Sequence, residues 1–213
     1  RTRMSPAIAE IIDFPLNIGE SPVWDERRGV LWFVDILAPA VYCVDPKTRA
    51  LSSFPMPAHV GSLSLVHDGR LVVALRTGVH LFDPGSGELA FLVHPEPERT
   101  MNRLNDGKVG PDGCFWVGSM HDARPREPTG ALYRVTPEGE CRLVLDGLKV
   151  SNGLGWSPDG TTLYHADTRA QCVKAYAFDA ASGSLGVGRT LIELSEEQGL
   201  PDGAAVDDAG CYW

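Results

Sequence analysis

The chain has 213 residues and a formal net charge of −9, with 23 glycines and 16 prolines. A chain of this length can bury a sizeable core, and its many glycines and prolines favour a turn-rich β protein over a helical one. The negative charge argues against nucleic acid or an anionic membrane as a partner, because neither would attract such a surface. The same charge is compatible with a cation-binding site.

The cysteines are five in number, widely spaced, and never in a C-x-x-C pair. Such a pattern predicts neither a disulfide framework nor a zinc ribbon. Three of them lie in apolar strand patterns, where we expect small buried hydrophobes: Cys43, Cys114 and Cys211. Since the chain also has no apolar run of membrane-spanning length and no apolar signal core, we expect a cytoplasmic protein.

After an extended apolar segment at 7–14, one pattern recurs five times along the chain. It consists of a short alternating apolar run, a turn that ends in glycine, and a β-rich run. The copies occupy 21–36, 62–75, 106–119, 153–168 and 203–213, and the turn glycines are 40, 44, 47 and 50 residues apart. These glycines are Gly29, Gly69, Gly113, Gly160 and Gly210. A period of 40–50 residues with this content is typical of β-propeller blades.

Each of the first four repeats continues into a third strand and an outer fourth strand, which predicts four-stranded antiparallel blades. The outer strands are expected near 50–56, 88–94, 141–147 and 190–195. All five tryptophans fall on first or second strands, where we expect core packing: Trp24, Trp32, Trp116, Trp156 and Trp213. The fifth repeat stops in mid-strand at Trp213. We therefore expect residues 1–213 to form one all-β propeller domain, about four blades plus one strand, that is truncated in its fifth blade.

Polar residues occupy one phase of the repeats, just before each innermost strand. In chain order this position holds Glu20, Gly61, Asn105, Asn152 and Asp202. Asn and Asp before a strand are often simple turn formers. However, a propeller brings equal phases to one mouth of its central channel, so four such side chains should converge there. Carboxylate and amide oxygens are what a hard or borderline divalent cation requires.

The second strands run back to the same mouth and end in further polar residues. The candidates for contact with a substrate there are Asp35, Asp167 and the run 119–122. The histidines show no H-x-H or H-E-x-x-H spacing, and no G-x-S-x-G segment is present. These absences argue against a histidine zinc site and against a covalent nucleophile.

Four ordered segments resemble motifs of the SMP30/gluconolactonase/luciferin-regenerating-enzyme-like family. They are GESPVW (19–24), RLNDGKV (103–109), SNGLGWS (151–157) and LPDG (200–203). The resemblance implies a six-bladed propeller with one divalent metal ion in its channel. It also implies that Glu20, Asn152 and Asp202 bind the metal and that Arg103 and Asn105 face the substrate. Some family members have a Glu shortly after Gly-Ser/Thr-Met; here the run is His121-Asp122-Ala123, and His121 is the candidate replacement.

The resemblance further implies hydrolysis of a small sugar lactone to its aldonic acid. Asp202 would serve as ligand, general base or both, and the ion could be Ca, Zn, Mg or Mn. Two alternatives remain open from the residues alone. One is a phosphotriesterase-like or other ester hydrolase that uses the same metal site. The other is a non-catalytic calcium-binding propeller.

Overall fold

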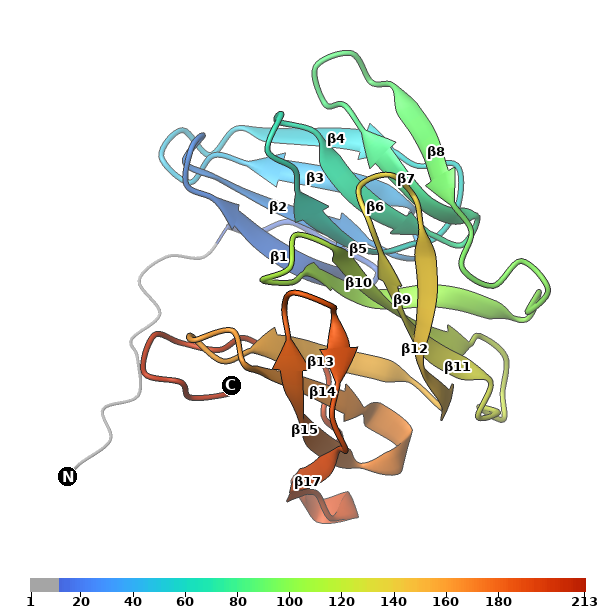
Figure 1. The fold of residues 1–213 in the computed structure, drawn as a ribbon. Helices are drawn as coiled ribbons and strands as arrows, with labels where there is room; N and C mark the ends of the chain where they lie inside the picture. The colour runs from blue at the N-terminus through green and yellow to red at the C-terminus, as the bar shows by residue number, and fades with distance from the viewer. Residues whose placement is uncertain (1–11) are drawn as a thin grey trace.

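The protein, seen here in a computed structural model, is described over residues 12–213, so most of the extended segment expected at 7–14 lies outside the described residues. Four antiparallel sheets follow one another in an arc, as blades of a β-propeller (Figure 1). Each sheet is built from strands in chain order, which confirms the predicted all-β fold of four-stranded blades. The innermost strands β1, β5, β9 and β13 begin at the same end of their blades, the end where the polar phase of the repeats lies.

The first blade contains β1 (Gly19–Asp25), β2 (Val30–Asp35), β3 (Ala40–Val44) and β4 (Leu51–Pro55). The second contains β5 (Val60–Leu65), β6 (Leu71–Leu75), β7 (Gly78–Phe82) and β8 (Leu89–Val93). The third contains β9 (Asn102–Val109), β10 (Phe115–His121), β11 (Gly130–Val135) and β12 (Cys141–Leu148).

The fourth blade differs from the prediction by one short strand. It contains β13 (Ser151–Trp156), β14 (Thr162–Asp167) and β15 (Cys172–Asp179). Both β16 (Ser184–Leu185) and β17 (Arg189–Glu193) then pair with β15, one at each end of it. The outer edge of this blade is thus divided, whereas a single outer strand was expected.

The repeat glycines make the turns that the pattern predicts. All five have positive φ angles, between 67° and 94°. Glycine adopts this left-handed conformation without the steric cost of a Cβ, which explains why it ends each turn. The fifth turn joins no full strands: the described residues after 203 contribute a single bridge between Val206 and Tyr212.

The tryptophan prediction is confirmed at three positions and wrong at two. Trp32, Trp116 and Trp156 are buried, whereas Trp24 and Trp213 are 48% and 71% exposed. Trp156 packs edge-on against Trp116 of the preceding blade, with ring centroids 6.0 Å apart. Trp24 has the equivalent place on β1, but no preceding blade stands beside it among the described residues, so its ring stays exposed.

The cysteines all have free thiols, but their burial varies more than expected. Cys114 is buried, Cys43 is half-buried and Cys211 is exposed, so the expectation of a buried hydrophobe is wrong for Cys211. Helical structure within residues 12–213 is limited to two 3-10 turns, Thr168–Ala170 and Glu196–Gln198. No helix of this part of the chain has the length and apolarity to cross a membrane.

Candidate metal and substrate site

A β-bulge interrupts the regular pairing of each inner strand at the polar phase. In β1 the register shifts between Glu20 and Val23, and in β13 it shifts between Asn152 and Gly155. The same irregularity occurs in β5 next to Gly61 and in β9 beside Asn105. Bulges re-aim side chains locally. The repeated bulge therefore turns the phase residues of successive blades in an equivalent way.

Two of the three predicted metal ligands are in direct contact. Asn152 Nδ2 donates to Asp202 Oδ1 over 2.7 Å, although 50 residues separate them. The second Nδ2 proton of Asn152 goes to Thr168 Oγ1 at 3.0 Å. Asn152 is buried, whereas Asp202 is exposed. The structure thus brings the fourth and fifth repeats together at the position that the phase predicts.

The third predicted ligand is Glu20, and its carboxyl group feels the negative charge of Asp202. Burial, together with the negative charges of Asp202 and Asp106, raises its pKa above the ordinary value. The Ser21 backbone N–H and the charge of Arg103 act in the opposite direction. Mutual repulsion of carboxylates at one place is what a bound cation relieves.

Arg103 and Asn105, the predicted substrate residues, are bonded to each other. Arg103 Nη1 donates to Asn105 Oδ1 at 2.7 Å and to the Leu104 carbonyl at 3.1 Å. Asn105 Nδ2 in turn donates to the Ser151 carbonyl at 2.9 Å. Both ends of the Asn105 amide are therefore occupied by protein groups. Arg103 keeps Nη2 without a protein partner among the described residues, so this nitrogen remains available for a ligand.

Asp106 belongs to the site but was not selected from the sequence. Its Oδ2 accepts the Leu154 N–H at 3.0 Å, which ties β9 to β13. Burial raises the pKa of Asp106, with the charge of Lys108 opposing that rise. The sequence did hold a signal for this role, because Asp106 comes one residue after the repeated polar position. Ser21 and Ser62 occupy the same position in the first two repeats, and each bonds to the next blade.

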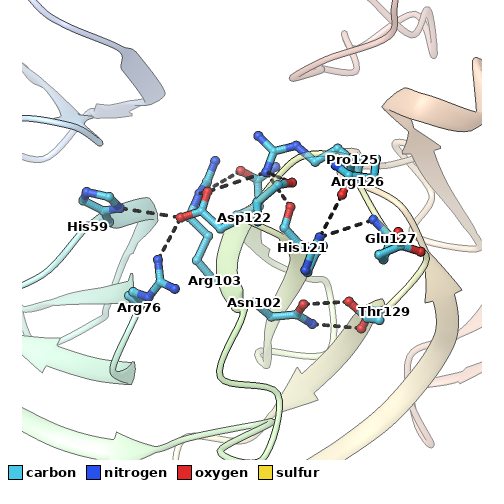
Figure 2. Close-up of polar contacts among 12 residues, drawn as sticks. His59, Arg76, Asn102, Arg103, His121, Asp122, Pro125, Arg126, Glu127 and Thr129 are labelled. Carbon is cyan, nitrogen blue, oxygen red and sulfur yellow. Dashed lines mark hydrogen bonds and ion pairs between the residues drawn. The ribbon is translucent and has the colours of Figure 1, made fainter.

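His121 turns toward its own loop (Figure 2). Its Nδ1 lies 3.2 Å from the Pro125 carbonyl oxygen and accepts the Glu127 N–H at 3.3 Å. The side-chain hydrogen bonds of His121 therefore stay within its loop and do not reach Glu20 or Asp202. Its neighbour Asp122 is the residue that reaches the site, with Oδ1 3.1 Å from Arg103 Nε.

Asp35 and Asp167, expected to contact a substrate, are used by the backbone instead. Asp35 accepts the N–H groups of residues 17, 18, 37 and 38 at 2.7–3.2 Å. Asp167 accepts those of 149, 150, 169 and 170 at 3.0–3.3 Å. Each carboxylate closes the loops around the end of its second strand. The structure therefore gives both carboxylates a structural role, and their contact with a substrate stays a prediction.

The residues fit a divalent cation by the chemistry of their donors. Within residues 12–213, no three His, Cys, Asp or Glu side chains gather as a metal centre by themselves. The expected set, however, contains two carboxylates and one amide. A half-turn of the Asn152 amide exchanges its nitrogen for its oxygen and points the oxygen toward Asp202 without moving the backbone. The set would then offer only oxygen donors, as Ca²⁺, Mg²⁺ or Mn²⁺ prefers.

A hollow at the opposite end of the second and third blades has a different character. Its lining is largely apolar and includes Leu65, Val66, Phe115 and Pro137. No convergent carboxylates line it. Glu20, Asn152 and Asp202, in contrast, lie at the end where the inner strands begin.

The chain is also similar to known proteins. The family described as SMP-30/Gluconolactonase/LRE-like region matches residues 18–213. The chain is 37% identical over 212 residues to 6-deoxy-6-sulfogluconolactonase of Pseudomonas putida, covering 99% of this chain and 72% of that protein. It is 34% identical to regucalcin of Xenopus laevis, covering 95% and 69%.

Among solved structures, a calcium-binding protein, regucalcin, from Agrobacterium tumefaciens superposes with a TM-score of 0.88. It is 27% identical, and the match covers 94% of this chain and 68% of that one. The repeat pattern, the blade architecture and the matched motifs agree. The chain belongs to the SMP-30/gluconolactonase/LRE-like family.

Proposed function

We propose that this chain is a divalent-metal-dependent hydrolase that opens a sugar lactone to the aldonic acid. The observation that carries the proposal is the hydrogen bond from Asn152 to Asp202, together with the charge interaction between Asp202 and Glu20. Relatives named as lactonases support the reaction class. A neighbour described as calcium-binding supports a metal.

Glu20, Asn152 and Asp202 would hold the ion. When bound, a divalent ion supplies a Lewis acid that polarises the lactone carbonyl and acidifies water. Asp202 is exposed and keeps Oδ2 without a protein partner among the described residues, so this oxygen is suited to take a proton from the attacking water. Arg103 Nη2 can donate to the carbonyl oxygen as negative charge develops on it.

Asn105 acts in this proposal by orienting Arg103. Its Oδ1 accepts from Arg103, and its Nδ2 is anchored on Ser151, so the amide sets where the guanidinium points. The five free cysteines suit a reducing compartment, and we place the protein in the cytoplasm.

Turnover of a substrate panel tests the proposal. The full chain, loaded with one of Ca, Zn, Mg or Mn at a time, is offered aldonolactones, an aryl carboxylic ester and a phosphotriester. We expect lactone hydrolysis that a chelator abolishes and metal restores. Faster hydrolysis of the ester or phosphotriester would instead support the alternative hydrolase. Metal binding without any turnover would support a calcium-binding propeller.

Two variants test the assigned roles. We expect Asp202→Asn to lower kcat for lactone hydrolysis at least about a hundredfold, because it removes a ligand charge and a base together. Asn105→Ala should cost less, about 1–3 kcal/mol of transition-state stabilisation, because it removes two hydrogen bonds but neither a metal ligand nor the base. Asp208→Asn, at an exposed position, is the control. Small and equal effects of the Asp202 and Asn105 variants would contradict both assignments.

A further inference from the structure

Three arginines converge on a single carboxylate beside the proposed site (Figure 2). Asp122 Oδ2 lies 2.8 Å from Arg76 Nη1, and Asp122 Oδ1 lies 3.1 Å from Arg103 Nε and 3.7 Å from Arg126 Nη1. His59 Nδ1 is 4.0 Å from Asp122 Oδ2. These residues come from the second and third blades, at the end where β6 and β10 finish. We call Arg76, Arg103, Arg126 and Asp122 the arginine cluster.

The arginine cluster carries more positive than negative charge. Three guanidinium groups are always protonated near neutral pH, and one carboxylate offsets one of them, which leaves two positive charges. Among the described residues, no other carboxylate lies within ion-pair distance of these arginines. Like charges held together repel, so a cluster that served only to join two blades would be better balanced.

The cluster is continuous with the proposed catalytic residues through Arg103. One end of this side chain contacts Asp122, while its Nη1 contacts Asn105. Burial lowers the pKa of Arg103, and Asp122 and Glu20 counteract that fall. A ligand held by Arg103 near Glu20 therefore lies next to the other two arginines as well.

The arginines still have donors to offer. Arg103 Nη2, Arg126 Nη2 and Arg126 Nε have no protein partner among the described residues. The three side chains are 37%, 11% and 21% exposed for Arg76, Arg103 and Arg126, so they are accessible yet partly shielded from water. Planar guanidinium groups recognise the oxygens of sulfonate, phosphate and carboxylate groups with paired hydrogen bonds.

We propose that the arginine cluster selects a sugar lactone that carries an anionic substituent away from its ring carbonyl. This inference rests on the proposed lactonase function and adds the substrate class. The carbonyl would lie at Glu20, Asn152 and Asp202, and the anionic substituent would lie at Arg76 and Arg126, with Arg103 between the two ends. Asp122 holds the three guanidinium groups in place before the anion arrives.

Substrate discrimination by the metal-loaded full chain tests this proposal. The probes are unmodified gluconolactone and gluconolactones that bear a sulfonate, a phosphate or a carboxylate at carbon 6. We expect kcat/KM to be at least tenfold higher for one of the anionic lactones than for the neutral one, mainly through KM. The order of kcat/KM among the three anionic lactones then shows which anionic group the cluster prefers.

Arg76→Gln and Arg126→Gln should each lower that anionic-to-neutral ratio about tenfold. Arg70→Gln is the matched control, because Arg70 forms an exposed ion pair with Asp68 at 2.6 Å near the opposite ends of the strands. It should keep the ratio of the parent protein. Thermal unfolding of each variant shows whether folding has changed.

Equal use of neutral and anionic lactones by the parent protein would overturn the proposal while leaving the lactonase function intact. Equal losses on both substrates, with a lower Tm, would also overturn it and make the cluster a structural link between blades. In the remaining case no lactone is turned over. The affinities of gluconate and 6-phosphogluconate, measured by calorimetry, then test the anion site without turnover. Tighter binding of the phosphorylated acid that Arg126→Gln abolishes would support the anion site and reject the lactonase function; equal binding would reject both.

Discussion

At the scale of single residues, a buried serine–histidine pair adjoins the proposed site without taking part in it. Ser151 Oγ lies 2.8 Å from His165 Nε2, and both residues are buried. Ser151 packs so closely against Gly118 that a Cβ there would clash with its hydroxyl. A substrate has no room at this serine, so the pair is a packing element. It fixes the start of β13, where Asn152 follows.

The buried histidine predicts a specific pH dependence of stability. Burial lowers the pKa of His165 from its ordinary 6.5 to about 4, although the charge of Asp167 opposes the shift. The unfolded chain therefore takes up this proton first as pH falls. The stability is complete above pH 6.5 and is lost progressively toward pH 4, by about 3 kcal/mol at about 1.4 kcal/mol per pKa unit.

Replacement of His165 isolates that contribution. The free energy of unfolding of His165→Gln should fall less between pH 7 and pH 4.5 than that of the parent protein, as denaturant titrations would measure. His67→Gln, at an exposed histidine, is the control and should keep the parent's dependence. If His165→Gln also keeps it, the titration belongs to other groups.

At the scale of elements, the inner strands approach one another so closely that one phase position must be glycine. A Cβ on Gly61 would lie 2.6 Å from the Leu104 carbonyl oxygen and 2.8 Å from that of Asn105. Next to it, Ser62 Oγ donates to the Asn105 carbonyl at 2.7 Å. The second blade thus has no side chain at the polar position, which lets β5 pack closely against β9, the strand that carries Arg103 and Asn105.

Gly61→Ala should therefore damage both stability and activity. We expect a loss of about 1–3 kcal/mol in the free energy of unfolding, because the added methyl group meets backbone atoms that cannot rotate away. The shift of β9 should also lower kcat for lactone hydrolysis. Gly203→Ala, where a Cβ meets no atom within 4 Å, provides the stability control. Wild-type stability of the Gly61 variant would show that β5 and β9 separate easily.

At the scale of the whole molecule, the proposed metal site joins parts of the chain that are far apart in sequence. Glu20 comes from the first repeat, Asn152 from the fourth and Asp202 from the fifth. Asp202 follows the last full blade, and its side chain accepts a hydrogen bond from Asn152. A cation shared by these residues would link the first blade to the end of the described fold.

Metal removal should therefore destabilise the fold as well as stop turnover. Metal at a hundred times its Kd should add about 2.7 kcal/mol to the free energy of unfolding, since it binds the folded chain preferentially. Thermal unfolding with metal or with chelator measures the difference, and Asp202→Asn should reduce it. An unchanged Tm together with metal-dependent turnover would contradict the expected link between metal binding and folding.

The sequence by itself determined the repeat, the turns and the shared phase of Glu20, Asn152 and Asp202. These features are periodic: a positive-φ glycine and a polar residue recur at fixed positions, and equal phase means equal place in a propeller. Tertiary structure alone decided the role of Asp106, the hydrogen bonds from backbone N–H groups to Asp35 and Asp167, and the exposure of Trp24. It also assembled the arginine cluster, because Arg76 and Arg126 lie in loops outside the repeated phase. The physical reason is that loop geometry and charge balance depend on neighbours from other blades, which no local pattern specifies.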